Sequence, residues 1–240
     1  MAIISTKAIV LSSLKYGDTS LIVKCFTKKE GLKSYMIRGV LKSKKGKLKP
    51  AYFQPLTQLQ ITASHTNKNT LNSIKEAQVV NYYNTIYTSV VKQSIVMFLA
   101  ETLSDVIREE EENISLYNYL ETGLIWLDTH DSIANFHLLF LLNLCRFLGF
   151  YPDMKEDDSI GFNLLEGRFT NSINDKLTIS GQEIISFKKL LGINFDVIHL
   201  VSFNKKERQV ILRMIIRYFE LHLDGFKEPK SLKVLETVFT

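Results

Sequence analysis

The spacing of apolar residues changes near residue 81, and that change constrains the fold more than any other feature of the sequence. In "TSLIVKCFT", Leu21, Val23 and Cys25 alternate with other side chains, which is the period of a half-buried β-strand. Beyond residue 81 the apolar residues recur every three or four positions, as they do on one face of an α-helix. The sequence therefore predicts two domains, a strand-rich one over residues 1–80 and a helical one over residues 81–240.

Five extended runs separated by turns fill the strand-rich domain. Glycine-containing turns such as "KYGD" and "KKEG" lie between them, and such turns punctuate strands. The runs are "KAIVLSSL" (7–14), "TSLIVKCFT" (19–27), "LKSYMIRG" (32–39), "PLTQLQITAS" (55–64) and "TLNSIKEAQVV" (70–80). Five short strands within 80 residues are typical of a small closed β-barrel.

The helical domain is expected to contain six helices and an irregular segment. The third helix is apolar nearly all round, which indicates the centre of a helical bundle. We expect Asp131 or Ser132 to cap its N-terminus and Gly149 to end it. Ser180 stands three residues before Glu183, which is the spacing of a capping box. The expected helices lie at 90–107, 116–127, 132–148, 180–191, 206–223 and 231–239, and the irregular segment lies at about 150–180.

Positive charge is concentrated in the strand-rich domain. Residues 1–80 contain 14 Lys and Arg against 3 Asp and Glu, whereas residues 81–240 contain 16 against 22. A split of this kind is typical of a polyanion-binding module joined to something else. Six cations fall within twelve positions without an acid among them: Arg38, Lys42, Lys44, Lys45, Lys47 and Lys49. An interpretation in which these lysines only keep the chain soluble explains less well why the excess is confined to this domain.

The basic loop formed by these six cations is the main functional feature of the sequence. Phosphates supply the negative charge that clustered cations need, and each neutralised phosphate releases counterions. Tyr16, Tyr35, Tyr52 and Phe53 lie near the loop in sequence, and aromatic faces on a barrel can stack on unpaired bases. Tyr52 is therefore a candidate binding residue, although burial in the core is the preferred interpretation of the aromatic residues. Because phosphates carry no sequence information, the loop predicts sequence-independent binding of nucleic acid.

The sequence shows no catalytic or cofactor motif. It has no Gly-rich phosphate loop, no GxGxxG and no GxSxG, and its five histidines are scattered singly, as surface or structural residues. We interpret "EEEEN" (109–113) as a solvated helix end, because consecutive residues on a helix point in different directions. Cys25 and Cys145 are too far apart to suggest a disulfide framework and predict reduced thiols in a cytoplasm. We therefore expect no enzyme, no cofactor, no secretory signal and no membrane span.

Several motifs, in order along the chain, resemble the bacterial recombination mediator RecO family. The first group comprises "GDTSLIV", "FTKKEG", "RGVLKSK" and "LKPAYFQPL". The second comprises "LLNLCRFLGFYPD" (141–153), "FNLLEGRFT" (162–170) and "RMIIRYFELHLDGFKEPKSLKVL" (213–235). Each motif alone is weak, but together they cover nearly the whole chain and are quite specific.

The resemblance implies an α+β multidomain fold with an N-terminal OB-fold, a helical domain and an inserted zinc-ribbon-like β-hairpin. It implies a DNA repair and recombination protein that binds single- and double-stranded DNA, anneals complementary strands and helps load the RecA recombinase. The implied partners are RecR and the acidic C-terminal tail of single-stranded DNA-binding protein, with a cytoplasmic, nucleoid-associated location. The six cations fall in the family's basic loop, and Arg213 and Arg217 lie on the matching C-terminal helix as candidate partner-binding residues.

One departure from the family concerns zinc. Many members place four cysteines around the segment that matches residues 154–172, but here it reads "MKEDDSIGFNLLEGRFTNS" without a cysteine. A tetrahedral zinc site needs four suitable ligands, so we expect a degenerate, metal-free hairpin. Two other functions stay open on the residues alone. One is an RNA-binding OB-fold protein, because phosphate contacts are shared, and the other is a protein-interaction scaffold that acts through its helical domain.

Overall fold

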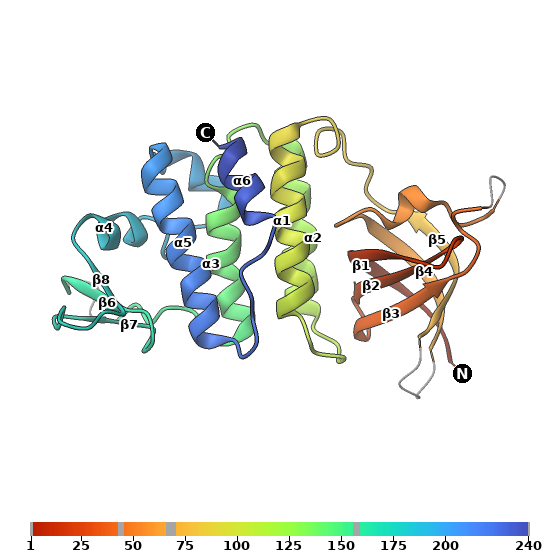
Figure 1. The fold of residues 1–240 in the computed structure, drawn as a ribbon, viewed down its shortest axis with the longest axis horizontal. Helices are drawn as coiled ribbons and strands as arrows, with labels where there is room; N and C mark the ends of the chain where they lie inside the picture. Colours follow the sequence, from red (N-terminus) through yellow and green to blue (C-terminus); the bar gives the residue numbers. More distant parts are fainter. Residues whose placement is uncertain (1, 43–45, 66–70, 156–158, 240) are drawn as a thin grey trace. The chain divides into compact units, whose positions relative to one another are not determined.

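The computed structural model describes residues 2–42, 46–65, 71–155 and 159–239 (Figure 1). Contacts divide the chain into two compact units, residues 1–129 and residues 130–240. The boundary between the units lies after the second helix, whereas the change of hydrophobic period lies near residue 81. The first two helices therefore belong with the strands, and each unit is described by itself.

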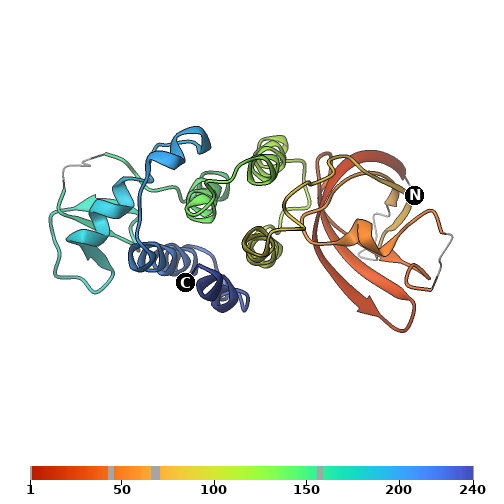
Figure 2. The same ribbon diagram turned by 90° about the horizontal axis from the view of Figure 1, so that it is seen from above.

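A five-stranded antiparallel sheet dominates the first unit, as the alternating runs predict. Its strand order is β3-β2-β1-β4-β5, and in Figure 2 the strands curve round a common interior. The edges meet where Asn72, just before β5, donates its backbone N–H to the Ser34 carbonyl at 2.9 Å, while Met36 of β3 donates to the Asn72 carbonyl at 2.9 Å. The strands are β1 (Ala2–Tyr16), β2 (Ser20–Thr27), β3 (Gly31–Ile37), β4 (Gln58–His65) and β5 (Ser73–Val79). The expectation of a small closed barrel is confirmed.

Alternate side chains fill the barrel, because successive residues of a strand point to opposite faces. Leu21, Val23 and Cys25 of β2 are buried in this core, as the alternation predicts. A short 3-10 helix, η1 (Pro50–Phe53), adds Phe53 to the same core. A bulge between Val10 and Ser12 shifts the register of β1 against β2, and such bulges increase the local twist that closes a barrel.

Two helices, α1 (Val90–Val106) and α2 (Ile114–Thr129), complete the first unit. Ser89 caps α1 by accepting a hydrogen bond from the backbone N–H of Lys92. The ring of Phe26 on β2 lies 6.2 Å from the ring of Tyr117 on α2, so the helices pack on the outer face of the barrel. The Lys7 ammonium on β1 pairs with the Glu121 carboxylate on α2 at 2.7 Å.

The acidic run after α1 is a loop and not a helix end, because α1 stops at Val106. The side chains of residues 109–112 are exposed, as expected. Their backbone, however, docks on β3, where Leu32 donates its N–H to the Glu109 carbonyl at 2.9 Å. A Cβ on Gly31 would lie 2.2 Å from the Glu111 carbonyl oxygen, and Gly31 has φ of +62°. Only glycine fits this contact between the β2–β3 turn and the acidic loop.

The second unit is built on α3 (Phe136–Leu148), α5 (Lys205–His222) and α6 (Leu232–Val238), with a 3-10 helix η2 (Phe195–Leu200). Nine of the thirteen residues of α3 are buried, which confirms the prediction of a core helix. Gly149 ends α3 in the left-handed region with φ of 85°, also as expected.

Two predicted helix caps are wrong. Helix α3 begins at Phe136, and its N-cap Asn135 makes no side-chain capping bond, so neither Asp131 nor Ser132 caps it. The Asn135 amide instead donates to the Val201 carbonyl at 2.7 Å, a tertiary contact that no local pattern encodes. Helix α4 (Gln182–Lys188) has Gly181 as its N-cap, because Ser180 ends a strand.

The irregular segment contains a small three-stranded sheet. The expected hairpin in "FNLLEGRF" is confirmed, since β6 (Gly161–Asn163) pairs antiparallel with β7 (Arg168–Thr170). A third strand, β8 (Thr178–Ser180), was not expected and pairs with the other edge of β6. Phe162 contacts the rings of Phe169 and Phe187 at centroid distances of 5.2 and 5.0 Å. Aromatic packing therefore holds this sheet, and its likeness to a zinc ribbon stays a prediction.

Within residues 2–42, 46–65, 71–155 and 159–239, no group of three or more His, Cys, Asp or Glu side chains is placed to hold a metal ion. No helix in the same part of the chain has the length and apolar character of a membrane span.

Candidate nucleic-acid interface

The start of the basic loop is fixed by backbone hydrogen bonds to the β1–β2 turn. β3 ends at Ile37, and Gly39 turns the chain with φ of 69°. Leu41 then donates its backbone N–H to the Thr19 carbonyl at 2.9 Å, and Lys42 donates to the Gly39 carbonyl at 3.2 Å. These bonds hold the first cations of the loop beside the β1–β2 turn.

The far end of the loop is anchored in the barrel core. Leu48 and Tyr52 pack against the core cluster while Phe53 is buried within it. The backbone N–H of Tyr52 donates to the Lys49 carbonyl at 3.0 Å, which closes the first turn of η1. The loop therefore joins two rigidly held ends.

The described cations of the loop face solvent. Arg38, Lys42, Lys47 and Lys49 are all exposed. Lys44 and Lys45, the other two predicted binding residues, lie outside the described residues. Apart from them, the loop presents its charge to solvent, as contact with a polyanion requires.

The protein's own carboxylates leave most of this charge uncompensated. The Lys47 ammonium lies 3.4 Å from a Glu76 carboxylate oxygen, and the two side chains are 81% and 62% exposed. An ion pair this exposed contributes at most about 1 kcal/mol. In the part of the chain that the structure describes, Arg38, Lys42 and Lys49 form no ion pair. A phosphate would therefore meet cations that are already largely free.

Other lysines of the barrel are used inside the first unit. The Lys24 ammonium donates to the Ser104 carbonyl of α1, and the Lys28 ammonium donates to the Asn118 side chain of α2 at 3.0 Å. The Lys33 ammonium lies 3.4 Å from the Glu110 carboxylate. Part of the charge excess in residues 1–80 therefore binds the helices and the acidic loop. The sequence does not reveal these contacts, because each joins two residues that lie 77 to 90 positions apart in the chain. The basic loop lies apart from these contacts.

The aromatic residues near the loop differ in exposure. Tyr35 and Phe53 are buried, which confirms the preferred interpretation of Phe53 as a core residue. The Tyr35 hydroxyl lies 2.9 Å from His65 Nε2, and His65 Nδ1 in turn contacts the Glu30 carboxylate. Tyr52 is half-buried against the core, so only part of its ring is open to a base. The stacking role of Tyr52 stays a prediction.

The candidate partner-binding arginines line a pocket in the second unit. The pocket has a volume of about 440 Å³ and is lined by residues of α4, α5 and α6 and of the small sheet and its β6–β7 turn. Arg213 and Arg217 contribute charge, and Glu183 and Glu236 contribute carboxylates. Its apolar lining comes from Leu164, Ile179, Val210 and Met214.

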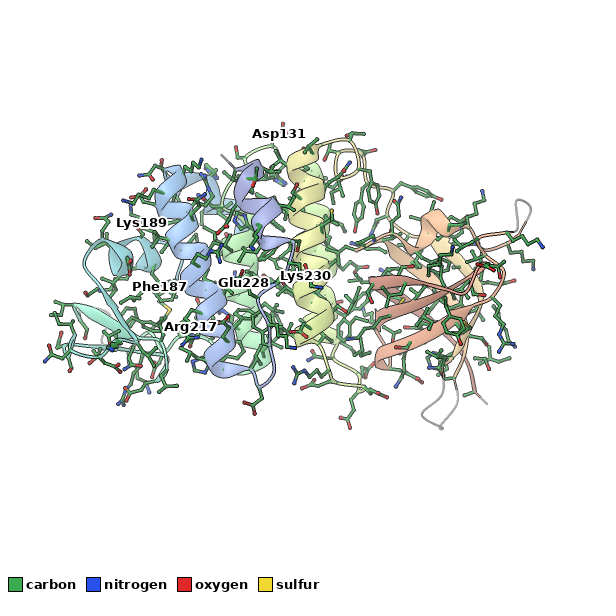
Figure 3. All side chains as sticks on the ribbon, in the orientation of Figure 1. Asp131, Phe187, Lys189, Arg217, Glu228 and Lys230 are labelled. Atoms are coloured by element: carbon green, nitrogen blue, oxygen red, sulfur yellow. The ribbon has the colours of Figure 1, made fainter. Side chains whose placement is uncertain are left out.

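The two arginines of this pocket differ in their existing partners. Arg213 forms two bonds of 2.6 Å with Glu236 and one of 2.8 Å with Glu228, and the Glu236 hydrogen bonds raise the pKa of the Arg213 guanidinium further. Arg217 pairs at 2.9 Å with Glu220, one turn along the same helix. Figure 3 labels Arg217 on α5 and Glu228 on the segment that follows it. Arg217 is therefore the arginine that an incoming carboxylate can reach with less competition.

Two cysteines and one histidine are held neutral by burial. Burial raises the pKa of the Cys25 thiol to about 12 and raises that of Cys145 well above its ordinary value. Burial, with help from the nearby Arg208 charge, lowers the pKa of His137 to about 3. A buried neutral thiol is unreactive, so these groups serve packing.

Comparisons with known proteins cover both parts of the chain. The family model described as "Recombination protein O N terminal" matches residues 1–83, and "Recombination protein O C terminal" matches residues 88–233. The DNA repair protein RecO of Christiangramia forsetii is 48% identical over 237 residues, which cover 99% of both chains. The protein of the same name from Flavobacterium johnsoniae is 49% identical over 237 residues, again 99% of both chains. That of Bacteroides fragilis is 40% identical over 240 residues, 98% of both chains.

Proposed function

The chain belongs to the recombination protein O family, a family of DNA repair proteins, and on that premise we propose that it is a non-enzymatic mediator of recombination. It binds single- and double-stranded DNA through the barrel, anneals complementary strands and helps load the RecA recombinase. One observation carries this proposal: the described cations of the basic loop are exposed, and only Lys47 has a carboxylate partner among the described residues.

Annealing follows from the same charges. Two complementary strands repel each other through their phosphates, and cations placed between them reduce that repulsion while the bases find their partners. The bases themselves then supply the free energy of pairing, so no nucleotide hydrolysis is needed. Because lysine and arginine contact phosphates without reading sequence, the protein can act at any break or gap.

Partner recruitment is proposed for the pocket lined by Arg213 and Arg217. A peptide that ends in acidic residues and carries an apolar anchor matches its combination of guanidinium groups and aliphatic side chains. The C-terminal tail of single-stranded DNA-binding protein has this chemistry, and we propose it as the occupant. We also propose RecR as a partner, without assigning its surface. Arg217→Ala is expected to weaken binding of a tail peptide severalfold, with the exposed Lys176→Ala as a control.

An annealing assay tests the proposed function. Complementary labelled strands are mixed with the protein, with and without ATP, over a series of salt concentrations. We expect annealing to be accelerated equally in the presence and absence of ATP and to slow as salt rises. An RNA pair of the same sequence provides the comparison with the RNA-binding alternative, which a preference for RNA would support. An ATP requirement, or no acceleration at low salt, would contradict the proposal.

A further inference from the structure

The outer face of strands β1, β2 and β3 is covered by the helices over only part of its length. At one end, Ile9, Leu11 and Phe26 are buried, with Phe26 packed on Tyr117 of α2. Lys24, two residues before Phe26 on the same face of β2, reaches the Ser104 carbonyl of α1. The remaining part of this face runs on towards the β1–β2 turn.

Large apolar side chains line the uncovered part. Leu14 is 65% exposed and Tyr16 is 57% exposed. Both lie on one face of β1, because alternate residues of a strand point the same way. Leu14 pairs with Ile22 of β2, which in turn pairs with Met36 of β3, and these two side chains are partly exposed. The result is a continuous apolar surface across three strands, with the Tyr16 ring at its end.

The basic loop begins beside this surface. Tyr16 pairs with Ser20, and the Ser20 hydroxyl accepts a hydrogen bond of 3.3 Å from the backbone N–H of Gly39. Leu41, which is 40% exposed, is bonded through its backbone to Thr19 of the same turn. Arg38 and Lys42 are thereby held next to the exposed tyrosine.

The charges around the surface are mostly positive. Lys15, Arg38 and Lys42 are exposed at this end of the barrel, and Asp18 is the acid among the described residues of the β1–β2 turn. Two copies of such a surface would repel each other, which argues against self-association. A flat aromatic ring lies next to cations that form no ion pair with the described residues. This combination matches a ligand in which flat bases and phosphates alternate. Only a strand with unpaired bases offers both, since a duplex buries its base faces.

We propose that Tyr16, supported by Leu14 and Leu41, is a stacking platform for the bases of single-stranded nucleic acid, with Arg38 and Lys42 on the adjoining phosphates. The inference rests on the proposed function and deepens it by naming the groups that contact bases. It assigns the stacking role to Tyr16, whose ring is largely exposed, in place of Tyr52, which packs against the core. A strand held by its bases on one barrel face is kept extended and free of hairpins, which favours annealing.

The experiment compares single-stranded and double-stranded DNA of the same length. Binding of a labelled strand, a matched duplex and a strand of abasic sites is measured for the full chain and for three variants. Tyr16→Ala removes the ring, and Tyr16→Phe keeps the stacking surface. Tyr82→Ala is the control, because Tyr82 is 77% exposed and lies after β5, away from the basic loop in sequence. Thermal melting checks that each variant folds.

We expect Tyr16→Ala to weaken single-strand binding about 5- to 150-fold, the range found for stacking aromatics. Duplex binding should change less than about twofold, because it depends on phosphate contacts alone. Tyr16→Phe and Tyr82→Ala should bind as the unchanged protein does. The unchanged protein should bind the abasic strand as weakly as Tyr16→Ala binds the normal strand.

Three results would overturn the inference. One is unchanged single-strand affinity in Tyr16→Ala, and the second is an equal loss for strand and duplex. The third is equal affinity of the unchanged protein for normal and abasic strands. If in any of these cases replacement of the loop lysines still abolishes DNA binding, the proposed function stands and only the stacking platform falls. If the lysine variant retains its DNA affinity, the proposed function itself fails.

Discussion

The carboxylate of Asp128, at the end of α2, accepts a hydrogen bond of 2.8 Å from the backbone N–H of Thr85. It also accepts from the N–H groups of Asn84 and Ile86, at 2.9 and 3.0 Å. One buried side chain thereby satisfies three donors in the segment that connects β5 to α1. These bonds fix the connecting segment to the end of α2.

The first prediction concerns this connection. Asp128→Ala leaves three backbone donors without an acceptor, and a buried donor left unpaired costs about 1–3 kcal/mol. Because Ile86 is buried whereas Asn84 is exposed to water, we expect a loss of about 1–3 kcal/mol in the free energy of unfolding of the first unit, measured by chemical denaturation. Asp128→Asn retains one acceptor oxygen and should lose less. Equal stability of Asp128→Ala and the unchanged protein would show that the bonds contribute nothing.

The second prediction is that the free energy of unfolding depends on pH because His137 is buried in its neutral form. Its ring is fully buried against Phe239, and among the described residues neither ring nitrogen has a hydrogen-bond partner. Its pKa of about 3 in the folded protein lies below the ordinary value of 6.5. Between these values the unfolded chain binds a proton that the folded chain does not, so stability falls as the pH falls below 6.5.

The matching experiment follows unfolding between pH 7 and pH 5.5. As the pH falls over this interval, His137 should account for a loss of about 1 kcal/mol in the free energy of unfolding. In His137→Leu the free energy of unfolding should therefore fall by about 1 kcal/mol less. At pH 7 the leucine variant should be at least as stable, since no hydrogen bond is removed. His199→Gln is the control, because His199 is exposed in the same unit. A profile that is as steep in His137→Leu as in the unchanged protein would contradict the assignment.

The third prediction tests the contact between the β2–β3 turn and the acidic loop. Gly31 and Gly17 both have positive φ, +62° and +58°, but a Cβ would meet the Glu111 backbone at Gly31 and nothing within 4 Å at Gly17. Gly17→Ala should therefore cost only the backbone strain of about 1 kcal/mol. Gly31→Ala should cost at least about 2 kcal/mol, measured by thermal melting. Equal melting temperatures for the two variants would show that the acidic loop does not contact the β2–β3 turn closely enough to exclude a Cβ.

The fourth prediction is that the small sheet at residues 161–180 is held without zinc. The rings of Phe162, Phe169 and Phe187 pack together there, and the segment contains no cysteine. We expect the purified protein to contain less than stoichiometric zinc by elemental analysis. Its melting temperature should not change when a chelator is added. Bound zinc at one equivalent, with loss of stability on chelation, would mean that other side chains complete a site.

The sequence predicted those elements whose pattern is local. The alternation of Leu21, Val23 and Cys25 placed β2 correctly, because burial on one side of a strand leaves its period in the sequence. Gly149 was assigned to the end of α3 for a similar reason, since few residues adopt a left-handed conformation there. The hairpin β6–β7 followed from its own residues.

Features that depend on distant residues could not be predicted in this way. The start of α3 was misplaced because Asn135 is held by Val201, more than sixty positions away. The spacing of Ser180 and Glu183 predicts a capping box, but nothing in the sequence indicates that β8 pairs with β6 and that Ser180 ends that strand. In the candidate site, the six cations were identified as a cluster. The sequence could not show which lysines face the helices or that Tyr16 is exposed beside the loop. Both features depend on strand register and packing.

The basic loop is the surface proposed to bind DNA phosphates, and its most direct test is the single-strand affinity of the protein at several salt concentrations. With about four phosphates neutralised, log K against log salt concentration should slope near −3 for the unchanged protein. Replacement of Lys42, Lys44, Lys45 and Lys47 by Ala leaves Arg38 and Lys49 in the loop, so the slope should become much shallower without vanishing, and binding should weaken with little change in melting. The control replaces four exposed lysines outside the barrel, Lys176, Lys205, Lys206 and Lys233, and should keep the slope near −3. A slope near zero in the unchanged protein, or equal losses in both variants, would contradict the account.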